Sequence, residues 1–217
     1  MTDIKKVLVV GNQYGVCQLF RAYKTKFRVL LDDKEEEPDI LVFTGGADID
    51  PKFYGEEPLQ STHTSKQRDD EDLEYWSLYP ATPKIGICRG AQFLNVMSGG
   101  SLFQHVTNHG RPHMIHNLLI IPGIEERSFY GSSMHHQMMI PSDEGEVLAI
   151  AKSPQYGVKK GLSEKYLSFS GKEPPRYDPE VVWYAKNKCL CYQGHPEYPV
   201  KPDERDYFLK LVKHFFG

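Results

Sequence analysis

Residues 83–97 read PKIGICRGAQFLNVM, which joins a short apolar run directly to an apolar pattern with helical spacing. The run through Ile87 is typical of a short buried strand, and the helical pattern stops at the glycine pair 99–100. A strand that passes directly into a helix exposes its turn residue at the top of a sheet, and glycines on both sides allow the backbone to make that turn. The stretch therefore predicts an α/β fold with Cys88 at a strand–helix junction.

Cys88 itself has two interpretations. A thiol at a helix N-terminus faces a partial positive charge, which favours the nucleophilic thiolate. The pattern Gly-x-Cys-x-Gly then indicates a nucleophile elbow with cysteine in place of serine. The alternative is a buried structural cysteine at a tight turn, and the pentapeptide alone leaves both open.

A nucleophilic cysteine needs a base, and the base needs a partner that orients it. Residues 189–197 read CLCYQGHPE, which indicates a strand that ends at Gly194, followed by His195 and, two residues on, Glu197. Residues i and i+2 of extended backbone point the same way, so Glu197 can hold one imidazole nitrogen while the other faces the thiol. The alternative is a surface His-Pro-Glu turn.

The remaining pattern predicts a three-layer α/β fold with a mostly parallel central sheet flanked by helices, in a single domain over residues 1–217. Residues 52–70 are expected to form a long loop, and residues 165–175 a surface loop. The expected strands cover 6–10, 40–43, 83–87, 115–121, 146–151 and a hairpin of 181–185 with 188–193, and the expected helices cover 16–26, 69–79 and 202–216.

Together, the two motifs resemble the class I glutamine amidotransferase superfamily, whose glutaminase domains carry G-x-C-x-G early and H-P-E late. Three stretches are similar to its γ-glutamyl hydrolase branch, peptidase family C26, which includes γ-glutamyl-γ-aminobutyrate hydrolases. Residues 43–58 match a glycine loop with DxxPxxYGEEP, residues 86–104 match GICRGxQxLNVxxGGxLxQ, and residues 132–137 match NSxHHQ. The resemblance covers almost the whole chain and implies a flavodoxin-like fold.

The resemblance also implies site roles. Cys88 would attack a γ-glutamyl amide carbonyl, His195 would act as general base and acid, and Glu197 would orient the imidazole. The oxyanion would be held by the N–H of Arg89 and an N–H of the glycine loop. The implied oxyanion-hole residues are Arg89, Gly45 and Gly46, and the implied substrate-binding residues are Gln92, Ser133, His135 and His136.

Two departures from the family pattern bear on the substrate. Gly194 replaces a large aromatic residue, which should open that wall of the pocket. Residues 153–160 contain lysines where relatives carry a DGxxE element, whose glutamate often lies near the substrate's amino group.

The composition argues against several other classes of protein. A formal net charge of −3 argues against a nucleic-acid-binding surface. The apolar run near the N-terminus is too short for a signal-peptide core or a membrane span, so we expect a cytoplasmic protein without disulfides among its four cysteines. Cys189 and Cys191 have the spacing of core residues on one strand.

A metal site is also not expected. His105, His109, His113 and His116 would form a ligand stripe on a helix, but Gly110 and Pro112 break any helix there. We expect no metal and no cofactor.

Three functions remain open at this stage. The first is a free-standing hydrolase of a small γ-glutamyl compound, and the second is a glutaminase subunit that uses glutamine and supplies ammonia to a separate synthase. The third is a binding module without catalysis. A homodimer is compatible with each of them.

Overall fold

The computed structural model describes residues 4–11, 14–23, 26–30, 36–106, 109–110, 113–117, 128–151, 166–167, 177–198 and 202–217. All structural statements below concern these residues. Within them, no helix is long and apolar enough to cross a membrane.

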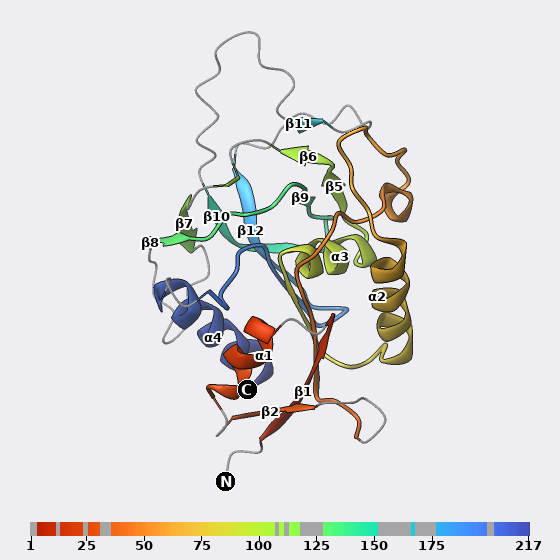
Figure 1. Ribbon diagram of the computed structural model, residues 1–217. Helices are drawn as coiled ribbons and strands as arrows, with labels where there is room; N and C mark the ends of the chain where they lie inside the picture. Colours follow the sequence, from red (N-terminus) through yellow and green to blue (C-terminus); the bar gives the residue numbers. More distant parts are fainter. Residues whose placement is uncertain are drawn as a thin grey trace.

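A central sheet has the strand order β2-β1-β3-β4-β13-β12-β10-β7-β8 in the described chain (Figure 1). One half of it is parallel: β2 (Phe27–Leu30), β1 (Lys5–Val10), β3 (Ile40–Phe43), β4 (Lys84–Ile87) and β13 (Cys189–Tyr192). The other half continues in antiparallel pairs: β12 (Asp178–Tyr184), β10 (Glu146–Ala151), β7 (His113–Asn117) and β8 (Ser128–Gly131). The predicted α/β fold with a parallel centre is confirmed, as is the hairpin that joins the two halves.

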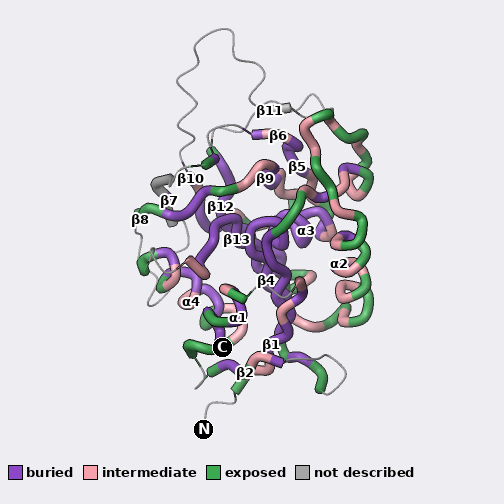
Figure 2. The backbone as a smooth tube through the Cα atoms, in the orientation of Figure 1, coloured by how far each residue is buried: buried purple, intermediate pink, exposed green. Residues whose placement is uncertain are grey.

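Helices cover both faces of this sheet (Figure 1). Helices α1 (Tyr14–Arg21) and α4 (Pro202–Phe216) pack on one face, and α2 (Lys66–Leu78) and α3 (Arg89–Met97) pack on the other. Side chains alternate between the two cores along each strand: Val7 of β1 joins the core under α1 and α4, whereas Leu8 and Val10 join the core under α3. The central strands are therefore buried on both faces, as parallel strands between helices must be (Figure 2).

Smaller elements stand beside the main sheet. Strand β5 (Ser101–Phe103) pairs with β9 (Met138–Ile140), β6 (His105–Val106) pairs with β11 (Tyr166–Leu167), and a 3-10 turn, η1, covers Pro51–Tyr54. The expected surface loop over 165–175 thus contains a two-residue strand, because the backbone of β6 offers it hydrogen-bond partners. The rest of that stretch lies outside the described residues.

Several boundaries differ from the sequence prediction. Helix α2 begins at Lys66, and η1 lies at Pro51–Tyr54, so the long loop expected over 52–70 is shorter. Helix α1 ends at Arg21 rather than at residue 26, because the chain turns there and the unpredicted strand β2 begins at Phe27. Only the end residues of that four-residue strand are buried, so its sequence lacks a clear period-two signal.

Candidate active site

Three neighbouring parallel strands, β3, β4 and β13, end at the same edge of the sheet. Loops that follow the carboxyl ends of parallel strands converge, which makes this edge the expected place for a site in an α/β sheet. A cavity of about 390 Å³ lies there. It is lined by Gly15, Gly45, Gly46, Cys88, Met134, His195, Glu197 and Tyr198. The structure therefore brings together the three residues assigned to catalysis and the glycine loop, which are distant in the sequence.

The turn at Cys88 has the predicted elbow geometry. Its φ of 54° and ψ of −111° lie in a region that side-chain-bearing residues rarely occupy, so this turn stores backbone strain. A β-carbon at Gly86 would lie 2.4 Å from the Gly90 carbonyl, and one at Gly90 would lie 2.2 Å from the Phe43 carbonyl oxygen. Glycine is thus required at both positions for β4, α3 and β3 to approach so closely. The Cys88 N–H donates to the Tyr192 carbonyl oxygen at 2.8 Å, which locks the elbow against β13.

His195 is held by Glu197 on one side and meets Cys88 on the other. Its Nδ1 lies 2.7 Å from Oε1 of Glu197, and the Tyr198 ring stacks on the imidazole at 4.8 Å. Burial lowers the pKa of His195, but the Cys88 side chain and the Glu197 carboxylate outweigh it and raise this pKa to about 11. A protonated imidazole beside the sulfur favours a thiolate–imidazolium pair, the reactive form of a cysteine nucleophile.

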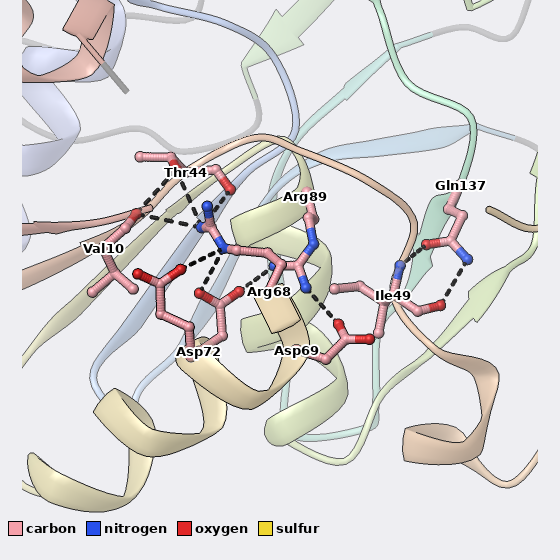
Figure 3. A network of polar contacts seen from close by, with 9 residues as sticks. Val10, Thr44, Ile49, Arg68, Asp69, Asp72, Arg89 and Gln137 are labelled. Atoms are coloured by element: carbon pink, nitrogen blue, oxygen red, sulfur yellow. Dashed lines mark hydrogen bonds and ion pairs between the residues drawn. The ribbon is translucent and has the colours of Figure 1, made fainter. Parts of the chain in front are cut away.

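Arg89, which directly follows Cys88, belongs to a buried network of polar contacts (Figure 3). Its side chain is 1% exposed, and its guanidinium donates to Oδ1 of Asp69 at 2.5 Å and to Oδ2 of Asp72. A β-carbon at Gly46 would lie 3.1 Å from Cδ of Arg89, so the glycine loop rests directly on this side chain. Arg89 therefore combines a backbone N–H at the start of α3 with a buried side chain beneath the pocket.

A second arginine ties the same network to the glycine loop (Figure 3). The Nε of Arg68 donates to Oδ1 of Asp72 at 3.1 Å, and its Nη2 donates to the Thr44 hydroxyl at 3.2 Å and to the Val10 carbonyl oxygen at 3.3 Å. Asp72 thus bridges the two arginines, and Thr44 directly precedes the glycine loop. The sequence analysis did not predict this network of two arginines and two aspartates, which we call the arginine brace. Two acidic residues at the i and i+3 positions 69 and 72 of the expected helix were a signal for it.

Three of the residues assigned to substrate binding lie in one polar layer, in which Gln92 and Ser133 are buried and His135 is partly buried. Nε2 of Gln92 donates to the Gln137 carbonyl oxygen at 2.7 Å and to Oε1 of Gln193 at 3.3 Å. Nδ1 of His135 lies 2.8 Å from the same carbonyl oxygen. Ser133 is 1% exposed, and its hydroxyl has no hydrogen-bond partner within the described residues.

The fourth residue, His136, belongs to a separate histidine cluster. Its Nδ1 lies 2.8 Å from Oδ2 of Asp48, and its Nε2 lies 2.6 Å from Nδ1 of His105. Burial and the adjacent His136 lower the pKa of His105. No group of three or more His, Cys, Asp or Glu side chains in the described part of the chain is placed to hold a metal.

Where the histidine stretch is described, it contains strands instead of a helix, as predicted. His105 lies in β6, His113 and His116 lie in β7, and the imidazole of His109 contacts Oδ2 of Asp178 at 3.1 Å. Pro112 lies outside the described residues. The core assignment of Cys189 and Cys191 is also confirmed, because both thiols are fully buried in the core under α3.

The structure adds carboxylates that the sequence analysis did not assign. Asp178 and Glu180 are both buried in β12, and Glu180 is 2% exposed with no hydrogen-bond partner for either carboxylate oxygen in the described chain. Burial raises the pKa of Glu180 well above its ordinary value, and the charges of Asp178 and Glu204 add to this effect. Acidic residues at inward-facing positions of an otherwise apolar strand were the available signal. The lysine-containing stretch 153–160 lies outside the described residues.

The expected opening of the pocket wall at Gly194 is wrong. A β-carbon at this position would lie 2.3 Å from Oε1 of Glu204 and 3.2 Å from Oγ of Ser132. The carboxylate from the first turn of α4 thus fills the space that a side chain at position 194 would need.

Comparisons with known proteins agree with this fold. The peptidase C26 family profile matches residues 31–157, more than half of the chain. A Schizosaccharomyces pombe protein named as a glutamine amidotransferase is 32% identical over 193 residues, which cover 82% of this chain and 69% of that protein. A Mycobacterium tuberculosis protein named likewise is 48% identical over 69 residues, which cover 30% of this chain and only 22% of that protein.

The same fold occurs in a solved structure from Thermoplasma acidophilum, titled as a GMP synthase subunit. It superimposes with a TM-score of 0.65 at 17% identity and covers 100% of this chain and 94% of that one. The profile match and the S. pombe relative place the chain by sequence, and the solved structure agrees in fold. The chain belongs to the peptidase C26 family of glutamine amidotransferase-like proteins, a family of hydrolase-type enzymes.

Proposed function

We propose that the protein hydrolyses γ-glutamyl amide bonds through a γ-glutamyl thioester on Cys88. One observation carries the proposal: the strained elbow places Cys88 in the same cavity as the His195–Glu197 pair. Nucleophile, base and orienting carboxylate then stand in the relation that acyl transfer requires.

The proposed reaction has two steps, acylation of Cys88 and hydrolysis of the thioester. The Cys88 thiolate attacks the γ-carbonyl carbon, and the resulting oxyanion accepts hydrogen bonds from the Arg89 N–H and from the glycine loop. His195 gives its proton to the departing nitrogen, the C–N bond breaks, and the amine leaves. Neutral His195 then takes a proton from water, the hydroxide attacks the thioester, and glutamate and the Cys88 thiolate are released.

Several buried polar groups without partners suit the head group of such a substrate. A γ-glutamyl group carries an α-ammonium and an α-carboxylate. Within the described residues, Glu180 and Oδ1 of Asp178 are acceptors without partners, and the Ser133 hydroxyl and Nε2 of Gln193 are donors without partners. Buried groups of this kind call for a partner, because an unsatisfied polar group in the interior is costly. The two kinds of group complement the two charges of the substrate.

Trapping the acyl-enzyme tests this proposal. The protein is mixed with a panel of γ-glutamyl amides, including glutamine, quenched with acid and digested, and the Cys88 peptide is examined by mass spectrometry. We expect one added γ-glutamyl group on Cys88 and turnover that disappears in Cys88→Ala. Cys17→Ala, which removes a buried thiol on α1, serves as the matched control and should retain both. Undiminished turnover in Cys88→Ala would refute the mechanism.

A glutaminase subunit is the second candidate, favoured by the likeness to a solved structure titled as a GMP synthase subunit. The chemistry at Cys88 is the same, but the released ammonia would pass to a partner synthase. Glutamine turnover that appears only when such a partner is added would select this alternative. The intact Cys88, His195 and Glu197 weigh against a binding module without catalysis.

A further inference from the structure

A hydrogen-bonded chain leads from the backbone of His195 to a carboxylate on α4. The His195 N–H donates to Oγ of Ser132 at 2.6 Å. Oγ of Ser132 lies 2.8 Å from Oε1 of Glu204, and the Ser132 N–H donates to Oε2 at 2.8 Å. A backbone N–H can only donate, so Oγ of Ser132 accepts there and gives its single proton to Glu204. Both carboxylate oxygens are therefore acceptors, which suits the ionised form.

The arrangement depends on the glycine that precedes the histidine. Glu204 is fully buried, and a β-carbon on Gly194 would lie 2.3 Å from its Oε1. Only a residue without a side chain at position 194 lets a carboxylate from α4 reach this point. The departure at Gly194 and the acid at position 204 thus fit one another.

Helix stabilisation does not account for this contact. An acidic residue in the first turn of α4 can interact with the helix dipole. Both oxygens of Glu204, however, are bonded to Ser132, which belongs to the segment between β8 and β9 and lies 72 residues away in the sequence. The carboxylate therefore joins α4 to the backbone of the histidine loop.

We propose that Glu204 is a second positioning carboxylate for His195, which acts on its backbone through Ser132 while Glu197 acts on its ring. The inference rests on the proposed reaction at Cys88. Glu204 fixes the path of the chain between β13 and Glu197, so that the imidazole stays aligned with the thiol. Its negative charge also favours the imidazolium form.

Other titratable groups surround this carboxylate. His195 and Glu197 on the histidine loop and Glu180 on β12 interact with Glu204 electrostatically. Burial raises the pKa of Glu204 above its ordinary value, and the charge of Glu197 adds to this effect, although the hydrogen bonds from Ser132 and the charge of His195 offset part of it. Because Glu180 and Glu197 remain in every variant of Glu204, a change in the titration of His195 in those variants reports on Glu204.

The test compares Glu204→Gln with Asp206→Asn, which removes an exposed carboxylate on the same helix that pairs with Lys210. We measure the His195 pKa by NMR, the rate of Cys88 alkylation by iodoacetamide against pH, and kcat and KM for the substrate that acylates Cys88. In Glu204→Gln we expect a lower His195 pKa, an altered alkylation profile and a kcat reduced roughly 10- to 100-fold at similar KM, as expected for a misplaced catalytic group. Asp206→Asn should match the wild type in all three.

Two of these readouts need no substrate, so the two proposals can fail separately. If the wild type turns over no γ-glutamyl compound, the proposed function fails, but the titration and alkylation still test Glu204. If Glu204→Gln leaves the pKa and the alkylation profile unchanged, Glu204 has no positioning role, whatever the enzyme hydrolyses.

Two further single variants keep the proposal testable if Glu204→Gln folds poorly, and they complete a double-mutant cycle if it folds. Gly194→Ala should displace the carboxylate and reproduce the lower His195 pKa, and Ser132→Ala should do so by removing the link. Because both act through the same contact, each should add little to Glu204→Gln, whereas full additivity of the effects would overturn the proposal.

Discussion

Two groups of buried carboxylates flank Cys88, and they are neutralised in different ways. On the elbow side, Asp69 and Asp72 of α2 meet the guanidinium groups of Arg68 and Arg89. On the histidine side, the carboxylates meet imidazoles, a hydroxyl and backbone N–H groups, and no guanidinium pairs with them in the described chain. The acids with these partners are Asp178, Glu197 and Glu204; a fourth acid, Glu180, has no hydrogen-bond partner in the described chain.

The difference corresponds to two tasks. Arginine carries a fixed positive charge, so the first group keeps two constant cations that hold the proposed oxyanion donors in place. Of its acids, Asp69 has a pKa that burial raises to about 6, although the adjacent Arg89 lowers it. Histidine titrates near neutral pH, so in the proposed reaction the second group takes up and releases a proton during turnover. The elbow side holds the backbone in place, and the proposed role of the histidine side is proton transfer.

Glu197→Gln should produce the largest effect. The amide cannot stabilise the imidazolium as the carboxylate does, so we expect kcat to fall by about 10³- to 10⁴-fold, as in comparable triads. Steady-state kinetics on the acylating substrate measure this loss, and thermal unfolding verifies that the fold is kept. A kcat within tenfold of the wild type would show that Glu197 does not orient the base.

Asp72→Asn weakens the ion pairs of the elbow side, where Asp72 joins Arg68 to Arg89. It leaves the buried guanidinium of Arg89 and the partly buried one of Arg68 without this carboxylate, and we expect a loss of about 3–5 kcal/mol in the free energy of unfolding. Asp70→Asn, which breaks an exposed pair with Lys66 on the same helix, should cost no more than about 1 kcal/mol. Urea unfolding of both variants makes the comparison, and equal losses would contradict a special role for the buried bridge.

Cys88→Ala tests how strongly the thiol raises the pKa of His195. The Cys88 side chain is the first of the influences that raise the His195 pKa, so this pKa should fall from about 11 by at least one unit, or about 1.4 kcal/mol. Because folding raises the pKa of His195, the protonated imidazole stabilises the folded protein fully below about pH 6.5. This stabilisation is lost as the pH rises through about 11, and in the variant the loss begins at lower pH. NMR titration of His195 checks the shift, and an unchanged pKa would show that the thiol does not contact the imidazole.

Glu180→Gln should have the smallest effect on stability and the opposite sign to Asp72→Asn. The raised pKa of Glu180 means that wild-type stability declines as the pH climbs above about 4.5, the usual value for this group. We expect the variant to unfold within about 1 kcal/mol of the wild type at pH 6 and to become the more stable protein at higher pH. Urea unfolding at pH 6 and pH 9 tests this. A loss of stability that does not depend on pH would instead show that Glu180 stabilises the fold, as Asp72 does.

The same variant tests the proposed head-group role. If Glu180 holds the α-ammonium of the substrate, its neutral isostere should raise KM for γ-glutamyl amides. A more stable protein that binds substrate less well would show that the wild type gives up stability for binding.

Local patterns in the sequence were sufficient to predict the centre of the site. The elbow at Cys88 could be read because glycines, an apolar strand and a helical pattern are adjacent in one short stretch. His195 and Glu197 are also neighbours, and the strand order of an α/β sheet then brings both stretches to one edge. Strands β3 and β10 and helix α4 were predicted with the bounds that the structure shows.

Only the tertiary structure decided what supports that centre. The bridge from Asp72 to two arginines, the contact of Gln92 with Gln193 across 101 residues, and the insertion of Glu204 beside Gly194 each join elements that are far apart in the chain. Strand β2 and the short strands β6 and β11 also depend on partners rather than on their own periodicity. A backbone pattern repeats within one element and is therefore visible in the sequence, whereas a buried charge acquires its partner only when packing brings two elements together.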